Sequence, residues 1–256
     1  MANTVWGADL NGDKLQGAAF AAELEKAEVS KGDFSTDYAA ICATHEITAC
    51  PFISMTGTNA CRIANTTVDL ASWRAALLAI AAEGSTVKEL SIHACGVTAQ
   101  HLEDVATAVE KMGSLAVLKM DYLTVQVAEG DAVEEGKSAD SGTGAHAAFL
   151  SFFKGTAAVE YLSLKGNNLN DLCSGEDVYN ALSENLTLKA LSLADNKLDD
   201  AACSKVITGL RQANALTELS LAKNLCTGAC LSDLQGLLIG SEVSAEDDAK
   251  FKNLSK

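Results

Sequence analysis

The chain has 256 residues, a formal net charge of −15 and a hydrophobic share of 48%. Nucleic acids and anionic membranes are bound through concentrated Lys and Arg, so this charge disfavours both as partners. It favours a partner protein with a basic surface, although acidity can also serve solubility alone.

The first residues, "MANTVWGADLNGDK", lack the basic and apolar regions of a signal peptide. No stretch reaches the ~18 apolar residues that a membrane helix requires. We therefore expect a cytoplasmic protein, monomeric, whose eight cysteines are reduced thiols.

Two segments before Cys50, residues 13–30 and 35–46, are predicted to be helices. We interpret residues 1–49 as an N-terminal helical cap, because the exposed end of a stacked structure needs a covering element. Further helices are predicted at residues 68–84, 98–112, 175–185 and 199–214.

Between these helices one pattern recurs, in "VEYLSLKGNNL" (159–169), "LKALSLADNKL" (188–198) and "LTELSLAKNLC" (216–226). Each copy is apolar at positions 1, 4 and 6, has Asn at position 9, and has an apolar residue or Cys at position 11. Looser copies lie at residues 87–97 and 115–125, and a weaker one at 50–60. The alternation within each copy predicts a short strand.

The spacing of position 4 is regular: Leu162, Leu191 and Leu219 are 29 and 28 residues apart, and Leu90 and Leu118 are 28 apart. The step from Leu118 to Leu162 is 44, and the step from Ile53 to Leu90 is 37, so each is one repeat plus an insertion. The larger insertion is the acidic segment 127–144, which we expect to be a mobile loop that either binds or is merely tolerated.

This pattern resembles the leucine-rich repeat of the ribonuclease-inhibitor-like class, and is similar to the repeats of the Ran GTPase-activating protein and of the C-terminal half of tropomodulin. The resemblance implies an α/β fold, a leucine-rich repeat solenoid shaped as a right-handed horseshoe with a parallel inner sheet and outer helices. We expect one domain over residues 1–256, with about six repeats at 50–229 and a C-terminal cap at 230–256.

The resemblance also gives position 9 a role, in which its side chain bonds neighbouring backbone groups as a ladder from repeat to repeat. It implies such a structural asparagine ladder at Asn167, Asn196 and Asn224, with Cys95 in the place of Asn in one copy. Leu123 and Thr58 depart from the pattern.

Side chains at positions 3, 5 and 7 of each copy should point to the concave, solvent-facing side. Small residues there can reflect crowding of the strands, whereas bulky ones can anchor a partner. The candidate partner-binding residues are Lys119, Tyr122, Tyr161, Lys165, Glu218 and Lys223.

Motifs for other chemistry are incomplete. "DLNGD" (9–13) lacks the glycine and the final glutamate of a calcium loop, and "DAVEEGKS" (131–138) lacks the first glycine of a phosphate-binding loop. We expect no metal, cofactor or catalytic residue, and a non-enzymatic protein–protein interaction module. The resemblance leaves open a GTPase-activating regulator or a tropomodulin-like actin binder.

Overall fold

The computed structural model describes residues 4–6, 11, 14–26, 29–57, 59–126, 143–154, 158–211, 213, 215–230 and 233–235. The chain forms two compact units, unit 1 with residues 1–148 and 156–159 and unit 2 with residues 149–155 and 160–256. The division falls within α5 (Thr143–Lys154). The predicted acidic loop lies outside the described residues, except that residues 143 and 144 begin α5.

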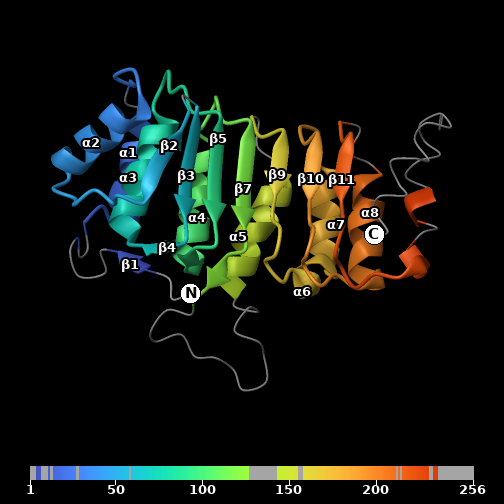
Figure 1. Cartoon of the computed structure of the whole chain (residues 1–256). Coiled ribbons are helices and arrows are strands. Elements are labelled where there is room, and N and C mark those ends of the chain that lie inside the picture. The colour runs from blue at the N-terminus through green and yellow to red at the C-terminus, as the bar shows by residue number, and fades with distance from the viewer. Residues whose placement is uncertain are drawn as a thin grey trace. The chain divides into compact units, whose positions relative to one another are not determined.

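Unit 1 contains four strands that pair in the order β2-β3-β5-β7 (Figure 1). They are β2 (Ile53–Thr56), β3 (Ala60–Ala64), β5 (Glu89–His93) and β7 (Val117–Asp121). β3, β5 and β7 run parallel, whereas β2 runs antiparallel to β3.

A second, smaller sheet follows in the order β1-β4-β6-β8, with every pair parallel. It is made of β1 (Thr4–Trp6), β4 (Thr66–Val68), β6 (Gly96–Val97) and β8 (Thr124–Val125). The last three strands each come shortly after a strand of the first sheet, so each turn of the chain contributes to both sheets.

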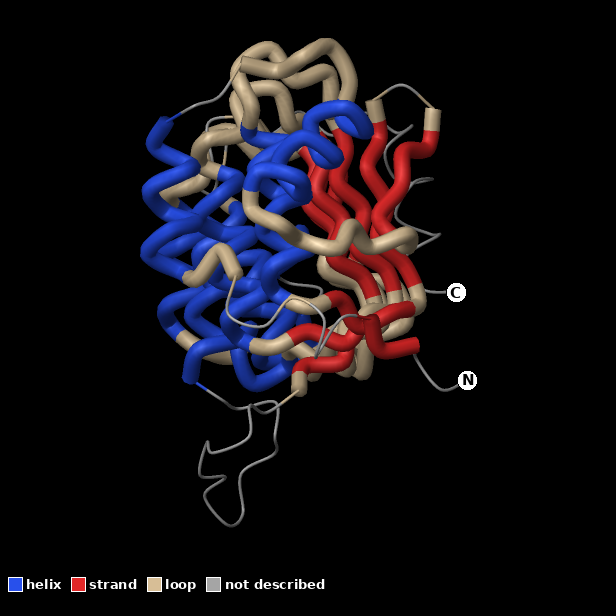
Figure 2. Tube along the Cα trace, turned by 90° about the vertical axis from the view of Figure 1, so that its left-hand side faces the viewer, coloured by secondary structure: helices blue, strands red, loops and turns tan. Residues whose placement is uncertain are grey.

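The helices of unit 1 lie on one face of its strands, as Figure 2 shows. They are α1 (Gly17–Lys26), α2 (Phe34–Thr44), α3 (Leu70–Ala81) and α4 (Ala99–Val109). Asp33 and Asp69 cap α2 and α3, because their side chains accept from the backbone N–H of Thr36 and Ser72. α1, α3 and α4 fall inside the predicted ranges, and α2 begins one residue before its range. α3 ends before Gly84, which adopts a positive φ of 80° in the following turn.

Unit 2 contains three parallel strands in the order β9-β10-β11. They are β9 (Tyr161–Ser163), β10 (Ala190–Ser192) and β11 (Glu218–Ser220), followed by the short helices α6 (Asn170–Cys173) and η2 (Gly228–Cys230) and by α7 (Glu176–Ser183) and α8 (Asp200–Leu210). Leu162, Leu191 and Leu219 are partners in adjacent strands, as their spacing of 29 and 28 residues predicts.

The repeat register predicted for residues 50–60 is wrong. Ile53 lies in the antiparallel strand β2, and the residue that pairs with Leu90 is Cys61 in β3. Cys61 precedes Leu90 by 29 residues, so the step matches the other repeats and needs no insertion. The error arose because this copy has Cys and Ile at the two buried positions, while the residues of β2 imitate the apolar alternation.

The cores of both units are built mainly from aliphatic side chains. Trp73 and Phe153 are the largest fully buried side chains, and Leu, Ile and Met residues make up the rest of the largest ones. The chain is therefore α/β, with mostly parallel strands and helices packed against them. Within the described ranges, every helix is too short or too polar to cross a lipid bilayer.

Candidate interaction surface

The strands of unit 1 bury one face and leave the other partly open. Along β5 and β7 buried and half-buried residues alternate, so alternate side chains point away from the core. The strand register places Arg62, Ser91 and Lys119 in one row across β3, β5 and β7 on this open face. The next row on the same face contains Ala64, His93 and Asp121.

Two side-chain pairs organise this open face. Nζ of Lys119 lies 2.7 Å from Oε1 of Glu89 on the neighbouring strand, with both side chains about one-third exposed. The ring of His93 meets the ring of Tyr122 edge to face, at 5.5 Å between centroids and 78° between planes. Tyr122 adopts φ 55° directly after β7, in the left-handed region, and this conformation turns its side chain where the strand ends.

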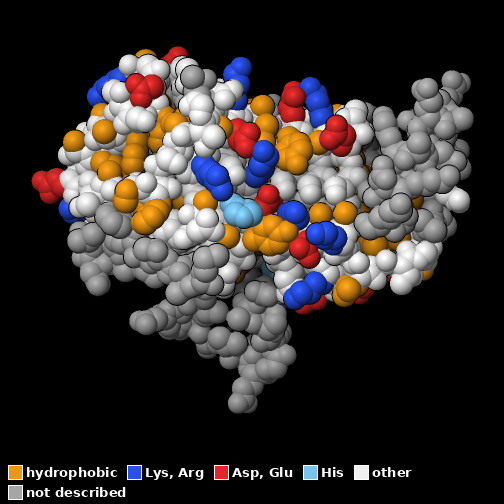
Figure 3. Space-filling view, viewed as in Figure 1, with side chains coloured by type: hydrophobic (Ala, Val, Ile, Leu, Met, Phe, Trp, Pro, Cys, Tyr) orange, Lys and Arg blue, Asp and Glu red, His pale blue; other side chains and the backbone are white. Residues whose placement is uncertain are grey.

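We call Arg62, Glu89, His93, Lys119 and Tyr122 the unit 1 face cluster. Cations and an anion are interleaved here with two aromatic rings, and Arg62 is exposed. Figure 3 shows basic and acidic side chains intermixed on the strand side of the molecule. Such a surface combines an amphipathic aromatic anchor with charges of both signs, which suits contact with a polar protein surface.

The open face of unit 2 carries smaller side chains. Its rows are Tyr161, Ala190 and Glu218, then Ser163, Ser192 and Ser220. Ala190, Ala194 and Ser163 are buried, whereas Glu218 is exposed.

The six predicted partner-binding residues are divided between the units. Lys119 and Tyr122 belong to unit 1, and within it they join Glu89 and His93. Tyr161, Lys165, Glu218 and Lys223 belong to unit 2; Tyr161 and Lys165 are half-buried and Lys223 is exposed at φ 58°.

Two of the three predicted ladder asparagines, Asn196 and Asn224, bond the backbone of the preceding repeat through their side chains. Nδ2 of Asn196, which is fully buried, donates to the carbonyls of Leu164 (2.9 Å) and Ala194 (3.3 Å), while its Oδ1 accepts from the N–H of Asn167 (2.8 Å). One repeat on, Oδ1 of Asn224 accepts from the N–H of Asn196 (2.8 Å). Asn196 and Asn224 thus each satisfy a backbone donor and a backbone acceptor of the preceding repeat.

In unit 1, shorter side chains than asparagine occupy position 9 of the repeat. The thiol of Cys95 is directed at the carbonyls of Ile63 (3.5 Å) and His93 (3.4 Å), and burial raises its pKa. In the repeat of β3, register places Thr66 here, where it is fully buried. A thiol or hydroxyl can replace only part of the bonding of an amide, so the pattern continues with fewer bonds.

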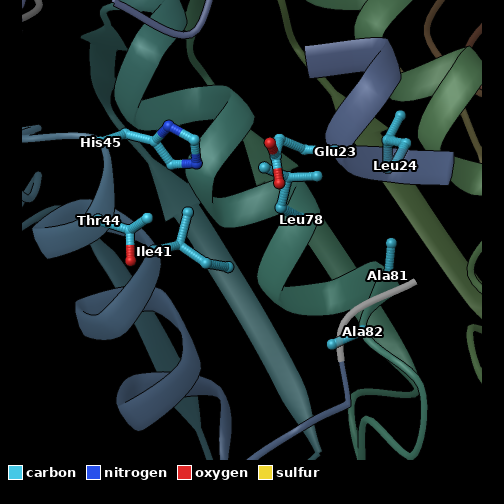
Figure 4. Close-up of a pocket in the computed structure, with 8 residues that line it drawn as sticks. All are labelled: Glu23, Leu24, Ile41, Thr44, His45, Leu78, Ala81 and Ala82. Atoms are coloured by element: carbon cyan, nitrogen blue, oxygen red, sulfur yellow. The ribbon is translucent and has the colours of Figure 1, made fainter. Parts of the chain in front are cut away.

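Two hollows lie in unit 1 away from the open face. The first, with room for about 30 Å³ of water, is enclosed by α1, α2 and α3 (Figure 4). Apolar side chains line much of it, and His45 and Glu23 point into it from opposite sides in Figure 4. The second is a wide cleft of about 580 Å³ beside the start of α2, lined by residues that include Asp33, Met55 and Lys88. Thr44 also lines the first hollow, but its hydroxyl donates to the backbone carbonyl of Ala40 (2.9 Å), one helical turn earlier in α2.

A buried polar network lies beneath these helices. Nε of Arg74 lies 2.6 Å from Oδ2 of Asp104, and its Nη1 donates to the carbonyl of Leu15 (3.1 Å). Burial raises the pKa of Asp104, and the Arg74 guanidinium works in the opposite direction. The pair joins α3 to α4 in the core, where a lone charge would be costly.

His101 occupies a second buried polar position, at the start of α4. Its Nε2 donates to the carbonyl of Val68 (2.9 Å), which can only accept, and its Nδ1 accepts from the N–H of Thr98 (3.2 Å). Burial lowers the pKa of His101 to about 4. Both ring nitrogens are therefore engaged by the fold, and the imidazole is neutral at pH 7 and serves structure.

Four buried cysteines have thiols that burial keeps protonated. Burial raises the pKa of Cys42 and Cys50 to about 11 and of Cys61 and Cys173 to about 12, so these thiols stay protonated at pH 7. Across the part of the chain that the structure describes, no three His, Cys, Asp or Glu side chains are placed to hold a metal ion.

The candidate residues named from sequence omit Arg62, Glu89 and His93. Arg62 was missed because the register of its repeat was wrong, and the 29-residue step from Cys61 to Leu90 is the signal that identifies it. Glu89 and His93 acquire their significance only from contact with the next strand.

Comparison of the sequence with models of known protein families gives no match, and comparison with curated proteins gives none either. Any function must therefore be argued from the geometry above.

Proposed function

We propose that the chain is a non-enzymatic interaction module of the leucine-rich-repeat kind, which binds a partner protein through the unit 1 face cluster. The 28- and 29-residue steps between paired strands support the repeat interpretation, as do the asparagine bonds in unit 2. The observation that carries the binding role is the set of charged and aromatic side chains on and directly after β3, β5 and β7. Arg62 is exposed, Glu89 pairs with Lys119, and the His93 ring meets the Tyr122 ring. Its mechanism is the presentation of a preorganised surface, which lowers the entropy lost on association.

The expected partner is a folded protein or peptide with basic groups beside an apolar or aromatic one. The net charge of −15 would raise its association rate, and the Tyr122 ring would supply the contact area. The residues Tyr161, Lys165, Glu218 and Lys223 stay candidates for a second contact on unit 2.

The test is cross-linked affinity capture by the full chain, comparing the unaltered protein with Lys119→Ala combined with Tyr122→Asn. Asn tolerates the positive φ of residue 122, so the fold is retained. The matched control is Lys111→Ala, which removes an exposed lysine from the helix side, where it pairs with Glu25. We expect the double variant to lose a partner that the control retains; loss in neither would refute the face cluster as the binding site.

A further inference from the structure

A cluster of three cysteines surrounds the end of the last described repeat in unit 2. Cys203 lies in α8 and is fully buried, Cys226 follows β11 and is half-buried, and Cys230 ends η2 and is buried. The mechanism proposed above uses none of them. Of the eight cysteines of the chain, Cys226 alone is not fully inside the fold.

Hydrogen bonds between Asp200, Thr227 and Cys230 place the three cysteines around one turn. Both oxygens of Asp200, in the first turn of α8, accept from Thr227, at 2.8 Å from its N–H and 2.7 Å from its hydroxyl. Cys203 is one helical turn after Asp200 on the same side of α8. Cys226 immediately precedes Thr227, and the thiol of Cys230 is directed at the Thr227 carbonyl, 3.6 Å away. Asp200 and Thr227 thus act as a clamp around which the cysteines gather.

The contacts among the thiols distinguish the possible pairs. Burial and a hydrogen bond with the Cys226 side chain both raise the pKa of Cys203. Cys230 is also hydrogen-bonded with the Cys226 side chain, but its thiol is directed at the Thr227 carbonyl as well, 3.6 Å away. Within the part of the chain that the structure describes, Cys203 is therefore the thiol that contacts Cys226 without also being directed at a carbonyl.

We propose that Cys226 is an oxidation site and that Cys203 is its resolving partner, so that a peroxide converts the pair to a disulfide. In the first step the Cys226 thiolate attacks one oxygen of hydrogen peroxide, an S–O bond forms, and hydroxide leaves. In the second step the Cys203 sulfur attacks that sulfur, an S–S bond forms, and the thiol proton of Cys203 leaves with the sulfenic oxygen as water. In sum, two thiols lose two electrons and two protons, and one hydrogen peroxide becomes two water molecules.

The bond would close a loop of 22 intervening residues that includes β11. It would tie the segment after β11 to α8, in addition to the hydrogen bonds of Asp200. A closed loop restricts the unfolded chain, so the oxidised protein should unfold at a higher temperature. Because the partner thiol is buried, access of the oxidant through half-buried Cys226 would set the rate.

The experiment treats the full chain with graded hydrogen peroxide, blocks free thiols with N-ethylmaleimide under denaturing conditions, and maps peptides without reduction. Cleavage after Lys197, Lys205 and Lys223 leaves Cys203 alone in one peptide and places Cys226 and Cys230 together in another. Cys230→Ser therefore removes the ambiguity in the second peptide. Cys173→Ser, which changes a buried cysteine elsewhere in unit 2, is the matched control.

We expect the count of free thiols to fall from eight to six, with a peptide linking Cys203 to Cys226 that persists in Cys230→Ser and Cys173→Ser and is lost in Cys226→Ser. A link from Cys226 to Cys230 would overturn the assigned partner. First oxidation at any other cysteine, or a Cys226 that goes directly to sulfinic acid, would overturn the site. No reaction at a peroxide concentration that oxidises a free cysteine peptide would do the same.

Discussion

Replacing Asn196 by alanine should reveal how much the asparagine bonds stabilise unit 2. The substitution removes three hydrogen bonds: two that Nδ2 donates, to Leu164 and Ala194, and one that Oδ1 accepts from Asn167. Asn196 is fully buried, so water cannot take their place without opening the turn. At roughly 1 kcal/mol for each bond, the free energy of unfolding should fall by about 3 kcal/mol.

The assay is urea unfolding followed by hydrogen exchange with mass spectrometry, which separates peptides of unit 2 from those of unit 1. Asn180→Ala is the matched control, because Asn180 is an exposed residue of α7 and alanine is the better helix former. We expect the control to change stability by less than ~0.5 kcal/mol. A loss below ~1 kcal/mol in Asn196→Ala would refute the reasoning, since it would mean that the turn finds other partners for its backbone at little cost.

Three further predictions concern single buried positions. Arg74→Met should lower the free energy of unfolding by ~3 kcal/mol or more, because it leaves Asp104 buried without its cation; chemical unfolding measures this, and a loss under ~1 kcal/mol would contradict it. His101 binds a proton less readily in the folded chain (pKa about 4) than in the unfolded one (pKa ~6.5). The contribution of His101 to the free energy of unfolding should therefore be constant above pH ~6.5, fall by up to ~3 kcal/mol as the pH drops toward 4, and level off below that pH. Thermal unfolding of His101→Gln at several pH values should lack this part of the pH dependence. Gly209→Ala should destabilise unit 2 by ~1–3 kcal/mol, since the added Cβ would lie 2.9 Å from the carbonyl oxygen of Tyr179; unchanged thermal unfolding would show that α7 and α8 separate freely.

The sequence predicted the strands best where the repeat is least altered. β9, β10 and β11 lie within the three copies that share "LSL", because leucines at positions 4 and 6 can be buried only if the strand alternates as the pattern says. At residues 50–60 the same reasoning failed. An antiparallel strand also alternates, and periodicity alone does not reveal the direction in which a strand runs.

The contacts of the candidate site were less accessible to sequence reasoning. The Lys119–Glu89 ion pair joins residues 30 positions apart, and the bond from His101 to Val68 joins residues 33 apart. Such pairs depend on the strand register and on the tilt of each strand. The repeat spacing fixes the register only to within one residue. Lys119 and Tyr122 could be chosen as bulky residues on an open face, but their partners could not.

Burial within each unit helps to separate packing from binding at the strand faces. In unit 2 the small side chains of the open face are explained by crowding, because Ser163, Ala190 and Ala194 are buried although they alternate with core residues. Larger groups at these positions would have to displace neighbouring strands. In unit 1 the equivalent row holds Arg62 and Lys119. Their long side chains reach solvent, and the packing of the core does not require them. Binding therefore explains these two side chains better than folding does, and the search for the partner should begin with unit 1.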